Sequence, residues 1–141
     1  MIKFMKDVEC MEMIRRNLYL NRIRPFIDQD LIKVLIGLRR SGKTILLSQI
    51  RDILLERGVA EENIIEINFE SRRFKKLEDA DTFYQYVTNR VEKANGKVYL
   101  FLDEIQHVTE WHSVIPSFRI DFDCDIYVTG SNSKLLSGEL A

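Results

Sequence analysis

The sequence contains few of the residues that characterise secreted, disordered and membrane-spanning chains. Among its 141 residues are 2 cysteines, 2 prolines and 6 glycines. Cys10 and Cys124 lie far apart and form no C-x-x-C pair, which argues against a disulfide framework or a zinc site and favours the reducing cytoplasm. The scarcity of proline and glycine argues against long disordered linkers.

Long apolar runs and a strong charge of one sign are also missing. The uninterrupted apolar stretches are only a few residues long, against the ~20 residues that span a bilayer, so we expect no membrane partner. Residues 1–16 carry acids without a sustained apolar core, unlike a secretory signal. The net charge of −1 gives no general reason to expect nucleic acid. A basic cluster at residues 71–76 leaves a nucleic-acid or acidic partner open beside the alternative of a solvated loop.

Apolar residues make up 45% of the chain, and their pattern alternates between strand-like and helix-like segments. A chain of this length is expected to form one core. The predicted strands cover residues 32–36, 63–69, 97–102 and 125–129, and the predicted helices cover residues 5–19, about 45–57, 80–93 and 111–118. This alternation predicts an α/β fold, a three-layer αβα sandwich around a mostly parallel sheet. We expect residues 1–24 to form an N-terminal helix and linker, and residues 25–141 to form the α/β domain.

The segment GLRRSGKT at residues 37–44 fits the phosphate-binding loop G-x-x-x-x-G-K-[ST]. Gly37 and Gly42 permit the backbone angles and the close approach that a polyphosphate requires. The following helix adds the positive end of its dipole, and the Lys43 ammonium can reach the β- and γ-phosphates. The Thr44 hydroxyl is placed to bind Mg²⁺. The candidate nucleotide-binding residues are Gly37, Leu38, Arg39, Arg40, Ser41, Gly42, Lys43, Thr44 and Ile45.

Two acids follow the third predicted strand in the segment KVYLFLDEIQ. An unpaired buried carboxylate is costly, so Asp103 is expected at the exit of the strand, facing a cation. With a phosphate loop in the chain, that cation is predicted to be Mg²⁺, bound by Asp103 together with Thr44. Adjacent side chains diverge in an extended segment, so Glu104 can orient a water that attacks the γ-phosphate and accept its proton. A solvated or helix-capping acid pair is the alternative.

The order of these motifs resembles one branch of the phosphate-loop ATPases, the AAA+ superfamily. A complete strand is predicted between Lys43 and Asp103, and a glutamate follows Asp103 directly, while the guanine-selective N-K-x-D signature is absent. The resemblance implies that a polar residue after the fourth strand senses the γ-phosphate, so Asn132, or failing it Ser131 or Thr129, is the candidate. A turn that opens the next helix is the alternative. The resemblance to the AAA+ superfamily also implies that Asn68 engages the catalytic glutamate. An asparagine with no role beyond ending the strand is the alternative.

Five segments carry a closer resemblance, to prokaryotic ATP-binding proteins with an N-terminal AAA domain and a C-terminal domain of unknown function. They are YLNRIRPF, IKVLIGLRRSGKTILL, NIIEINFES, KVYLFLDEIQ and CDIYVTGSNSKLLSGELA, in this order along the chain. Such proteins continue into a fifth core strand, an arginine that completes a neighbouring active site, a helical lid and a C-terminal domain. The resemblance thus implies a truncated chain in which residues 25–141 form a partial phosphate-loop ATPase domain. It also implies that the first strand lies at a sheet edge and that the chain hydrolyses ATP slowly.

The expected function is binding and hydrolysis of Mg-ATP by a module that couples the nucleotide state to a conformational change. Glu104, Lys43 and Asn132 are the candidate catalytic residues. A homo-oligomer and a protein partner are open possibilities. The alternatives are a regulatory module that keeps ATP bound with little turnover, and a phosphoryl transferase that uses the same loop.

Overall fold

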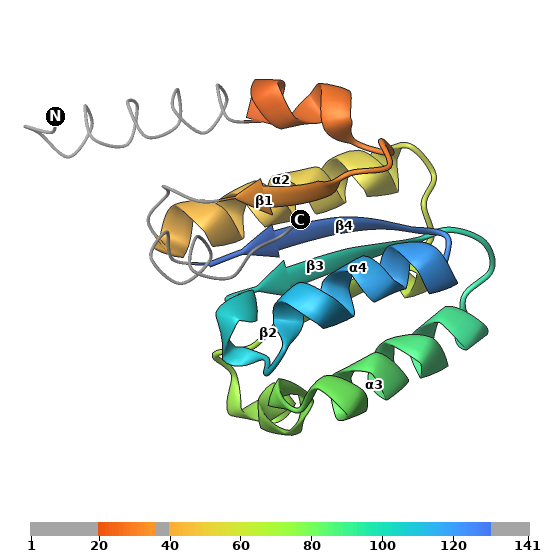
Figure 1. Ribbon diagram of the computed structural model, residues 1–141. Helices are drawn as coiled ribbons and strands as arrows, with labels where there is room; N and C mark the ends of the chain where they lie inside the picture. Colours follow the sequence, from red (N-terminus) through yellow and green to blue (C-terminus); the bar gives the residue numbers. More distant parts are fainter. Residues whose placement is uncertain (1–19, 36–39, 131–141) are drawn as a thin grey trace, which may run out of the picture.

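The sheet is four-stranded and entirely parallel. The computed structural model describes residues 20–35 and 40–130, with only the backbone of Arg40 and Ser41 (Figure 1). In spatial order the strands are β1 (Ile32–Leu35), β4 (Cys124–Thr129), β3 (Val98–Asp103) and β2 (Ile64–Asn68). Every neighbouring pair is parallel. Parallel neighbours need crossover connections, and the alternation of the sequence supplies them.

Helices cover both faces of this sheet. Helix α2 (Arg40–Glu56) lies on one face, and α3 (Ala80–Lys93) and α4 (Trp111–Asp121) lie on the other (Figure 1). Short 3₁₀ helices complete the connections. They are η1 (Arg24–Phe26), which follows helical residues 20–23, η2 (Glu61–Asn63), η3 (Arg72–Glu78) and η4 (Ile105–His107). The predicted three-layer α/β fold is confirmed.

Local signals explain where two of the helices begin and end. Gly58 follows α2 with φ of 93°, a left-handed conformation in which glycine lacks the steric penalty of a Cβ. The Val59 N–H then bonds back to the Leu54 carbonyl over 3.0 Å. At the start of α3, the Asp79 carboxylate accepts from the Thr82 N–H over 2.9 Å, which satisfies a donor of the first turn.

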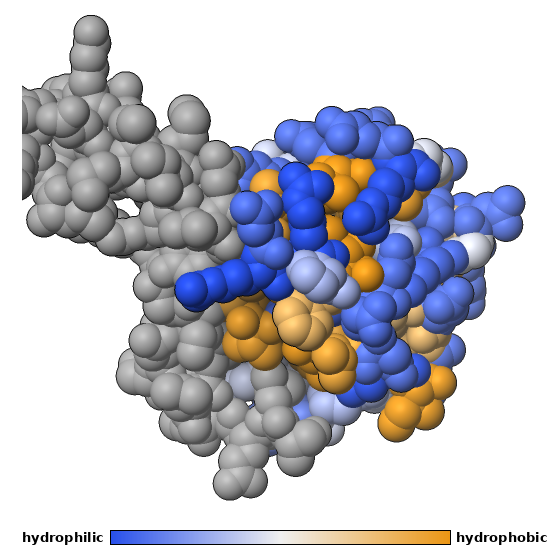
Figure 2. Space-filling view, turned by 90° about the horizontal axis from the view of Figure 1, so that it is seen from above, coloured by the Kyte–Doolittle hydropathy of each residue, from blue (hydrophilic) through white to orange (hydrophobic). Residues whose placement is uncertain are grey.

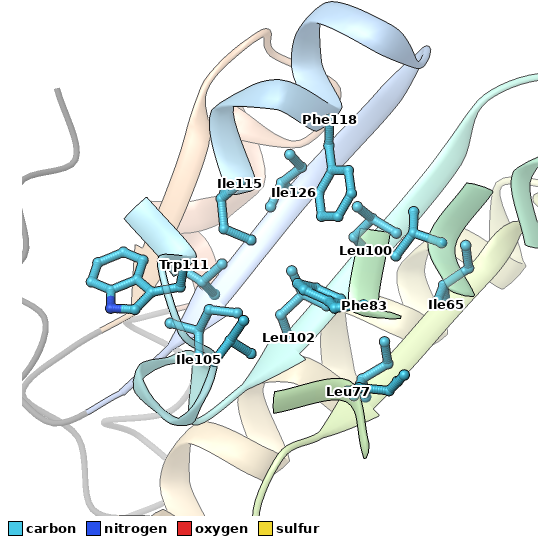
Figure 3. Close-up of a cluster of buried hydrophobic side chains, with 14 of the residues drawn as sticks. Ile65, Leu77, Phe83, Leu100, Leu102, Ile105, Trp111, Ile115, Phe118 and Ile126 are labelled. Atoms are coloured by element: carbon cyan, nitrogen blue, oxygen red, sulfur yellow. The ribbon is translucent and has the colours of Figure 1, made fainter. Parts of the chain in front are cut away.

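The core consists of two apolar clusters, one on each face of the sheet. One cluster joins β2, β3 and β4 to η3, α3, η4 and α4, with Phe83, Ile105 and Phe118 fully buried at its centre (Figure 3). The other joins α2 to the opposite face of the strands through residues such as Ile50 and Tyr127. Strand β3 therefore has apolar side chains against both layers, as expected of a central parallel strand.

Strand β1 has a different environment because it lies at the edge. It pairs with β4, and among residues 20–35 and 40–130 no strand pairs with its other side. Val34 of β1 is exposed by 37%, and Phe26 and Leu31, in the segment before β1, are exposed by 45% and 52%. Figure 2, which looks from the β1 side of Figure 1, shows apolar side chains among polar ones on this face.

Predicted and observed boundaries differ by small amounts. Strand β2 omits Asn63 and Phe69, β3 is shifted to include Asp103, and α4 extends to Asp121. The predicted helix over residues 5–19 lies outside the described residues. No helix in the described part of the chain is long and apolar enough to cross a membrane.

Candidate active site

The polar side chains predicted for the site meet at the carboxyl end of the sheet. Leu102 is paired with Val128 and Asp103 with Asn68, so the register brings the ends of β2, β3 and β4 to one level. Helix α2 starts beside this edge, where its Lys43 contacts the Gly130 carbonyl just after β4 (Figure 1). Ligands of open parallel sheets bind at this edge, beyond the carboxyl ends of the strands.

Lys43 lies in the first turns of α2 and is buried. Its Nζ donates to the Gly130 carbonyl over 2.8 Å and lies 3.5 Å from Glu104 Oε1. Only 6% of the residue is exposed. Arg40, Ser41 and Gly42 precede it in the first turn, where backbone N–H groups lack acceptors within the helix. Ile45 follows Thr44 in the same helix, half-buried. The predicted loop residues Gly37, Leu38 and Arg39 lie outside the described residues.

Asp103 ends β3 half-buried and contacts two hydroxyl groups. The Thr44 hydroxyl donates to Asp103 Oδ2 over 3.4 Å, and the Thr129 hydroxyl donates to Oδ1. Burial raises the pKa of Asp103, and the nearby Glu104 carboxylate raises it further, while the hydrogen bonds from Thr129 and Thr44 oppose the shift. A cation placed beside Asp103 would stabilise the ionised form of this carboxylate.

The pair of Asp103 and Thr44 fits Mg²⁺ by its chemistry. A carboxylate and a hydroxyl offer hard oxygen donors, and Mg²⁺ usually takes one or two carboxylates and completes its shell with water and phosphate oxygens. Groups of three or more His, Cys, Asp or Glu that could hold a metal are absent from the described residues. The described site therefore suits a cation bound jointly with a phosphate ligand better than a cation enclosed by protein.

Glu104 departs from the extended conformation expected for it. Its φ is 60° and its ψ is 52°, so the chain turns left-handed immediately after β3. This region is uncommon for residues other than glycine, and it recurs at functional sites. The side chains of Asp103 and Glu104 do diverge as expected, but the left-handed turn is the reason. The turn directs Glu104 to Lys43 and to Gln106, whose Nε2 donates to Glu104 Oε2. Only 8% of Glu104 is exposed.

Thr129 connects the two acids. Besides donating to Asp103, its fully buried hydroxyl accepts from the Glu104 N–H over 3.0 Å. Thr129 is also the third of the candidates predicted to sense the γ-phosphate. The other two, Asn132 and Ser131, lie outside the described residues, so their role stays a prediction.

The two weaker candidates lie beside the site. The Asn68 side-chain oxygen accepts from the Glu70 N–H over 3.0 Å, which is a local turn at the end of β2. The residues of the basic cluster, Arg72, Arg73, Lys75 and Lys76, are exposed on η3. Lys75 is paired with Glu78 over 3.2 Å on the same helix, an arrangement typical of a solvated surface.

Two residues that contact the candidate site, Gly130 and Gln106, were not predicted from the sequence. Gly130 supplies a backbone carbonyl to Lys43, and Gln106 supplies an amide to Glu104. A carbonyl carries no residue-specific signal. Gln106 is the last residue of the segment KVYLFLDEIQ, but its contact depends on the left-handed turn at Glu104, which the residue types do not reveal.

Comparisons with known proteins give one family match and two relatives. The model of an AAA domain family matches residues 29–141. An uncharacterized protein of Haemophilus influenzae is 46% identical over 129 residues, which cover 92% of this chain and 32% of the relative. The uncharacterized protein MJ1544 of Methanocaldococcus jannaschii is 34% identical over 144 residues, covering 96% of this chain and 31% of the relative. The chain thus spans about a third of the length of these relatives. No solved structure matches.

The family match covers the strands, the start of α2 and the acids at the end of β3, and the observed fold is that of a phosphate-loop nucleotide-binding protein. The chain belongs to the AAA domain family, whose members are nucleotide-binding domains of the ATPase type.

Proposed function

We propose that the chain binds ATP with Mg²⁺ at the carboxyl end of the sheet and hydrolyses it there. The observation that carries this proposal is the convergence of a buried Lys43 on Glu104, with the Asp103–Thr44 pair next to it. These are the groups that phosphate binding, metal binding and water activation need, supplied by separate elements of one edge.

Binding is an exchange of anions at Lys43. Its ammonium lies against the Glu104 carboxylate, and the triphosphate offers more negative charge. A phosphate oxygen therefore replaces Glu104 as the anion next to Nζ, while the Gly130 carbonyl keeps the lysine oriented. The first turn of α2 contributes N–H groups and the positive end of its dipole.

Asp103 and Thr44 would hold Mg²⁺. A cation bound there supplies charge neutralisation for the phosphate oxygens. The Thr129 hydroxyl donates to Asp103 and keeps its carboxylate oriented toward α2.

Hydrolysis uses the glutamate that the exchange releases. Glu104 accepts a proton from water, the water oxygen bonds to the γ-phosphorus, and the bond from that phosphorus to the bridging oxygen of ADP breaks. Lys43 belongs to α2, whereas Glu104 lies between β3 and η4. Binding therefore alters a contact between two elements, which is how the nucleotide state would be coupled to a conformational change.

Two substitutions test the assignment. Lys43→Ala removes the charge that faces the phosphates, and we expect the affinity for Mg-ATP in calorimetry to fall by about a hundred-fold or more. Glu104→Gln preserves the shape, so binding persists, while the single-turnover rate falls by about 10²- to 10⁴-fold, the usual contribution of a general base. Lys93→Ala, on the exposed surface of α3, is the matched control and leaves both quantities unchanged.

The outcomes separate the candidate functions. A folded wild-type protein that gives no heat with millimolar Mg-ATP refutes the whole proposal. Tight binding with ATP intact long after loading indicates the regulatory module instead. Release of phosphate that requires an added acceptor indicates a phosphoryl transferase.

A further inference from the structure

Gln106 contacts Glu104, and the proposed function assigns it no role. It is the middle residue of η4, two positions after Glu104, and its Nε2 donates to Glu104 Oε2. The left-handed φ of 60° at Glu104 folds the chain back so that this short-range contact forms.

Ile105 connects η4 to the core. Ile105, between the two polar residues, is fully buried and packs in the cluster of Figure 3 with Leu102 and Trp111. Because Ile105 anchors the turn in the core, the backbone positions of Glu104 and Gln106 are fixed relative to the sheet. The contact between their side chains is therefore a defined feature of the site.

Glu104 is held at three atoms by three different residues. Its N–H donates to Thr129, its Oε1 lies 3.5 Å from Lys43 Nζ, and its Oε2 accepts from Gln106. When a phosphate oxygen replaces Glu104 beside Lys43, Glu104 loses only the contact between its Oε1 and Lys43 Nζ. Oε1 is then the oxygen able to accept a proton, while Oε2 stays bound to the amide.

The orientation of the Gln106 amide supports this division. Its Oε1 is buried, and within residues 20–35 and 40–130 it has no hydrogen-bond partner. A buried acceptor without a partner is unfavourable. In this orientation the Gln106 amide directs its donor to the Glu104 carboxylate, as the division between the two oxygens requires.

We propose that Gln106 is a positioning residue for ATP hydrolysis, which holds Glu104 by one oxygen so that the other faces the attacking water. This inference rests on the proposed function of Glu104. Gln106 acts through Glu104 and need not touch the nucleotide.

The test separates the chemical step from binding. Gln106→Met keeps the length of the side chain and removes the donor. We expect the single-turnover rate with Mg-ATP to fall about ten- to a hundred-fold, the value of a hydrogen bond to a charged group, with the dissociation constant for Mg-ATP within about two-fold of wild type. Gln106→Glu, which replaces the donor with an acceptor, shows the same loss. Gln85→Met is the matched control, because Gln85 is exposed on α3 and bonds to Asn89.

A double-mutant cycle shows whether Gln106 acts through Glu104. In the Glu104→Gln background, Gln106→Met should slow hydrolysis no further, because the group it positions is gone. Additive losses would overturn the inference, since they indicate a general structural effect. So would a Gln106→Met protein as fast as wild type while Glu104→Gln is inactive, and in that case the proposed function stands.

A measurement without nucleotide completes the test. The side-chain amide protons of Gln106, assigned by NMR from their loss in Gln106→Met, should exchange slowly with solvent, and Glu104→Ala should abolish this protection. Unprotected amide protons in the wild-type protein overturn the inference whatever the hydrolysis rate. Failure of wild type to bind ATP refutes the proposed function separately.

Discussion

Two buried lysine–carboxylate pairs lie at opposite ends of the sheet, and they differ in how completely they are bonded. Lys33 and Asp125 meet near the amino ends of β1 and β4. Lys43 and Glu104 meet at the carboxyl end. All four residues are exposed by less than 9%. The same chemical pair can thus serve two purposes, and the surrounding bonds decide which.

The amino-end pair is saturated with hydrogen bonds. Lys33 contacts Asp125 directly and also donates to the Gln29 carbonyl. Asp125 further accepts from the Tyr127 hydroxyl and, over 2.9 Å, from the Asp28 N–H. A buried charge with this many partners is stable in place, and it fixes the segment before β1 against β4.

The carboxyl-end pair is looser. Its atoms are 3.5 Å apart, Glu104 has a left-handed backbone, and Asp103 adds a second negative charge beside it. A weak pair can be exchanged for a stronger ligand at little cost, whereas a saturated pair cannot. This difference predicts that the amino end contributes stability and the carboxyl end contributes function.

The largest effect is expected from breaking the saturated pair. Asp125→Ala leaves the Lys33 ammonium buried without its carboxylate, and we expect the free energy of unfolding in urea to fall by about 3–5 kcal/mol. The double substitution Lys33→Met with Asp125→Leu removes both charges and should recover a large part of that loss. A single variant as stable as wild type would contradict the assigned role.

A smaller loss is expected from the hydroxyl that supports this pair. Tyr127→Phe removes one donor to Asp125 and should lower the free energy of unfolding by about 1.5–3 kcal/mol, the value of a hydrogen bond to a charge. Tyr99→Phe is the comparison variant, because it removes a similar hydrogen bond to a more exposed carboxylate. The Tyr99 hydroxyl donates over 2.6 Å to Asp28, whose side chain is 41% exposed, so its loss should be smaller. Equal losses would show that burial of the acceptor is irrelevant.

The order of the elements and the end of the sheet at which the candidate site residues meet could be predicted from the sequence. Apolar strands alternating with helices determine a parallel sheet, and in such a sheet the ends of all strands share one edge. Lys43, Thr44, Asp103 and Glu104 follow strands or start a helix in the sequence, so their convergence follows from topology alone.

The details that distinguish the two pairs could not be predicted. Lys33 and Asp125 are 92 residues apart, and a lysine in an edge strand usually extends its charge into solvent. Their meeting depends on the register of β1 against β4, in which Lys33 is paired with Tyr127. The left-handed turn at Glu104 is equally hidden, because residue type gives no signal for it there.

Removing the carboxylate of the Lys43–Glu104 pair should change the free energy of unfolding far less than removing that of the Lys33–Asp125 pair. Glu104→Gln removes the anion beside Lys43, but Lys43 keeps the Gly130 carbonyl and an amide oxygen at position 104 as acceptors, and Asp103 loses a negative neighbour. We therefore expect the free energy of unfolding to stay within about 1 kcal/mol of wild type or to increase. The same urea titration that measures Asp125→Ala measures this variant. A loss as large as that of Asp125→Ala would remove the distinction between the two ends.

The smallest effect concerns pH at the amino end. Burial alone would raise the pKa of Asp28, but the hydrogen bonds from Tyr99 and Lys97 and the charges of Lys97 and Arg57 outweigh it and lower the pKa. A folded pKa below the unfolded value of about 3.9 means that the contribution to stability is complete above that value and is lost as pH falls through the folded pKa.

Asp28→Asn tests this contribution without disturbing the backbone. Asp28 has φ of 68°, a region that asparagine tolerates, and the amide oxygen can still accept from Tyr99. We expect wild type to exceed the variant in unfolding free energy by up to about 1 kcal/mol at pH 7, because the carboxylate is partly solvated. The difference should shrink as pH falls below about 4, where the carboxyl group takes up a proton and becomes as neutral as the amide. A difference that persists unchanged at pH 2 would mean that the two side chains differ in packing, and that the charge of Asp28 does not stabilise the amino end.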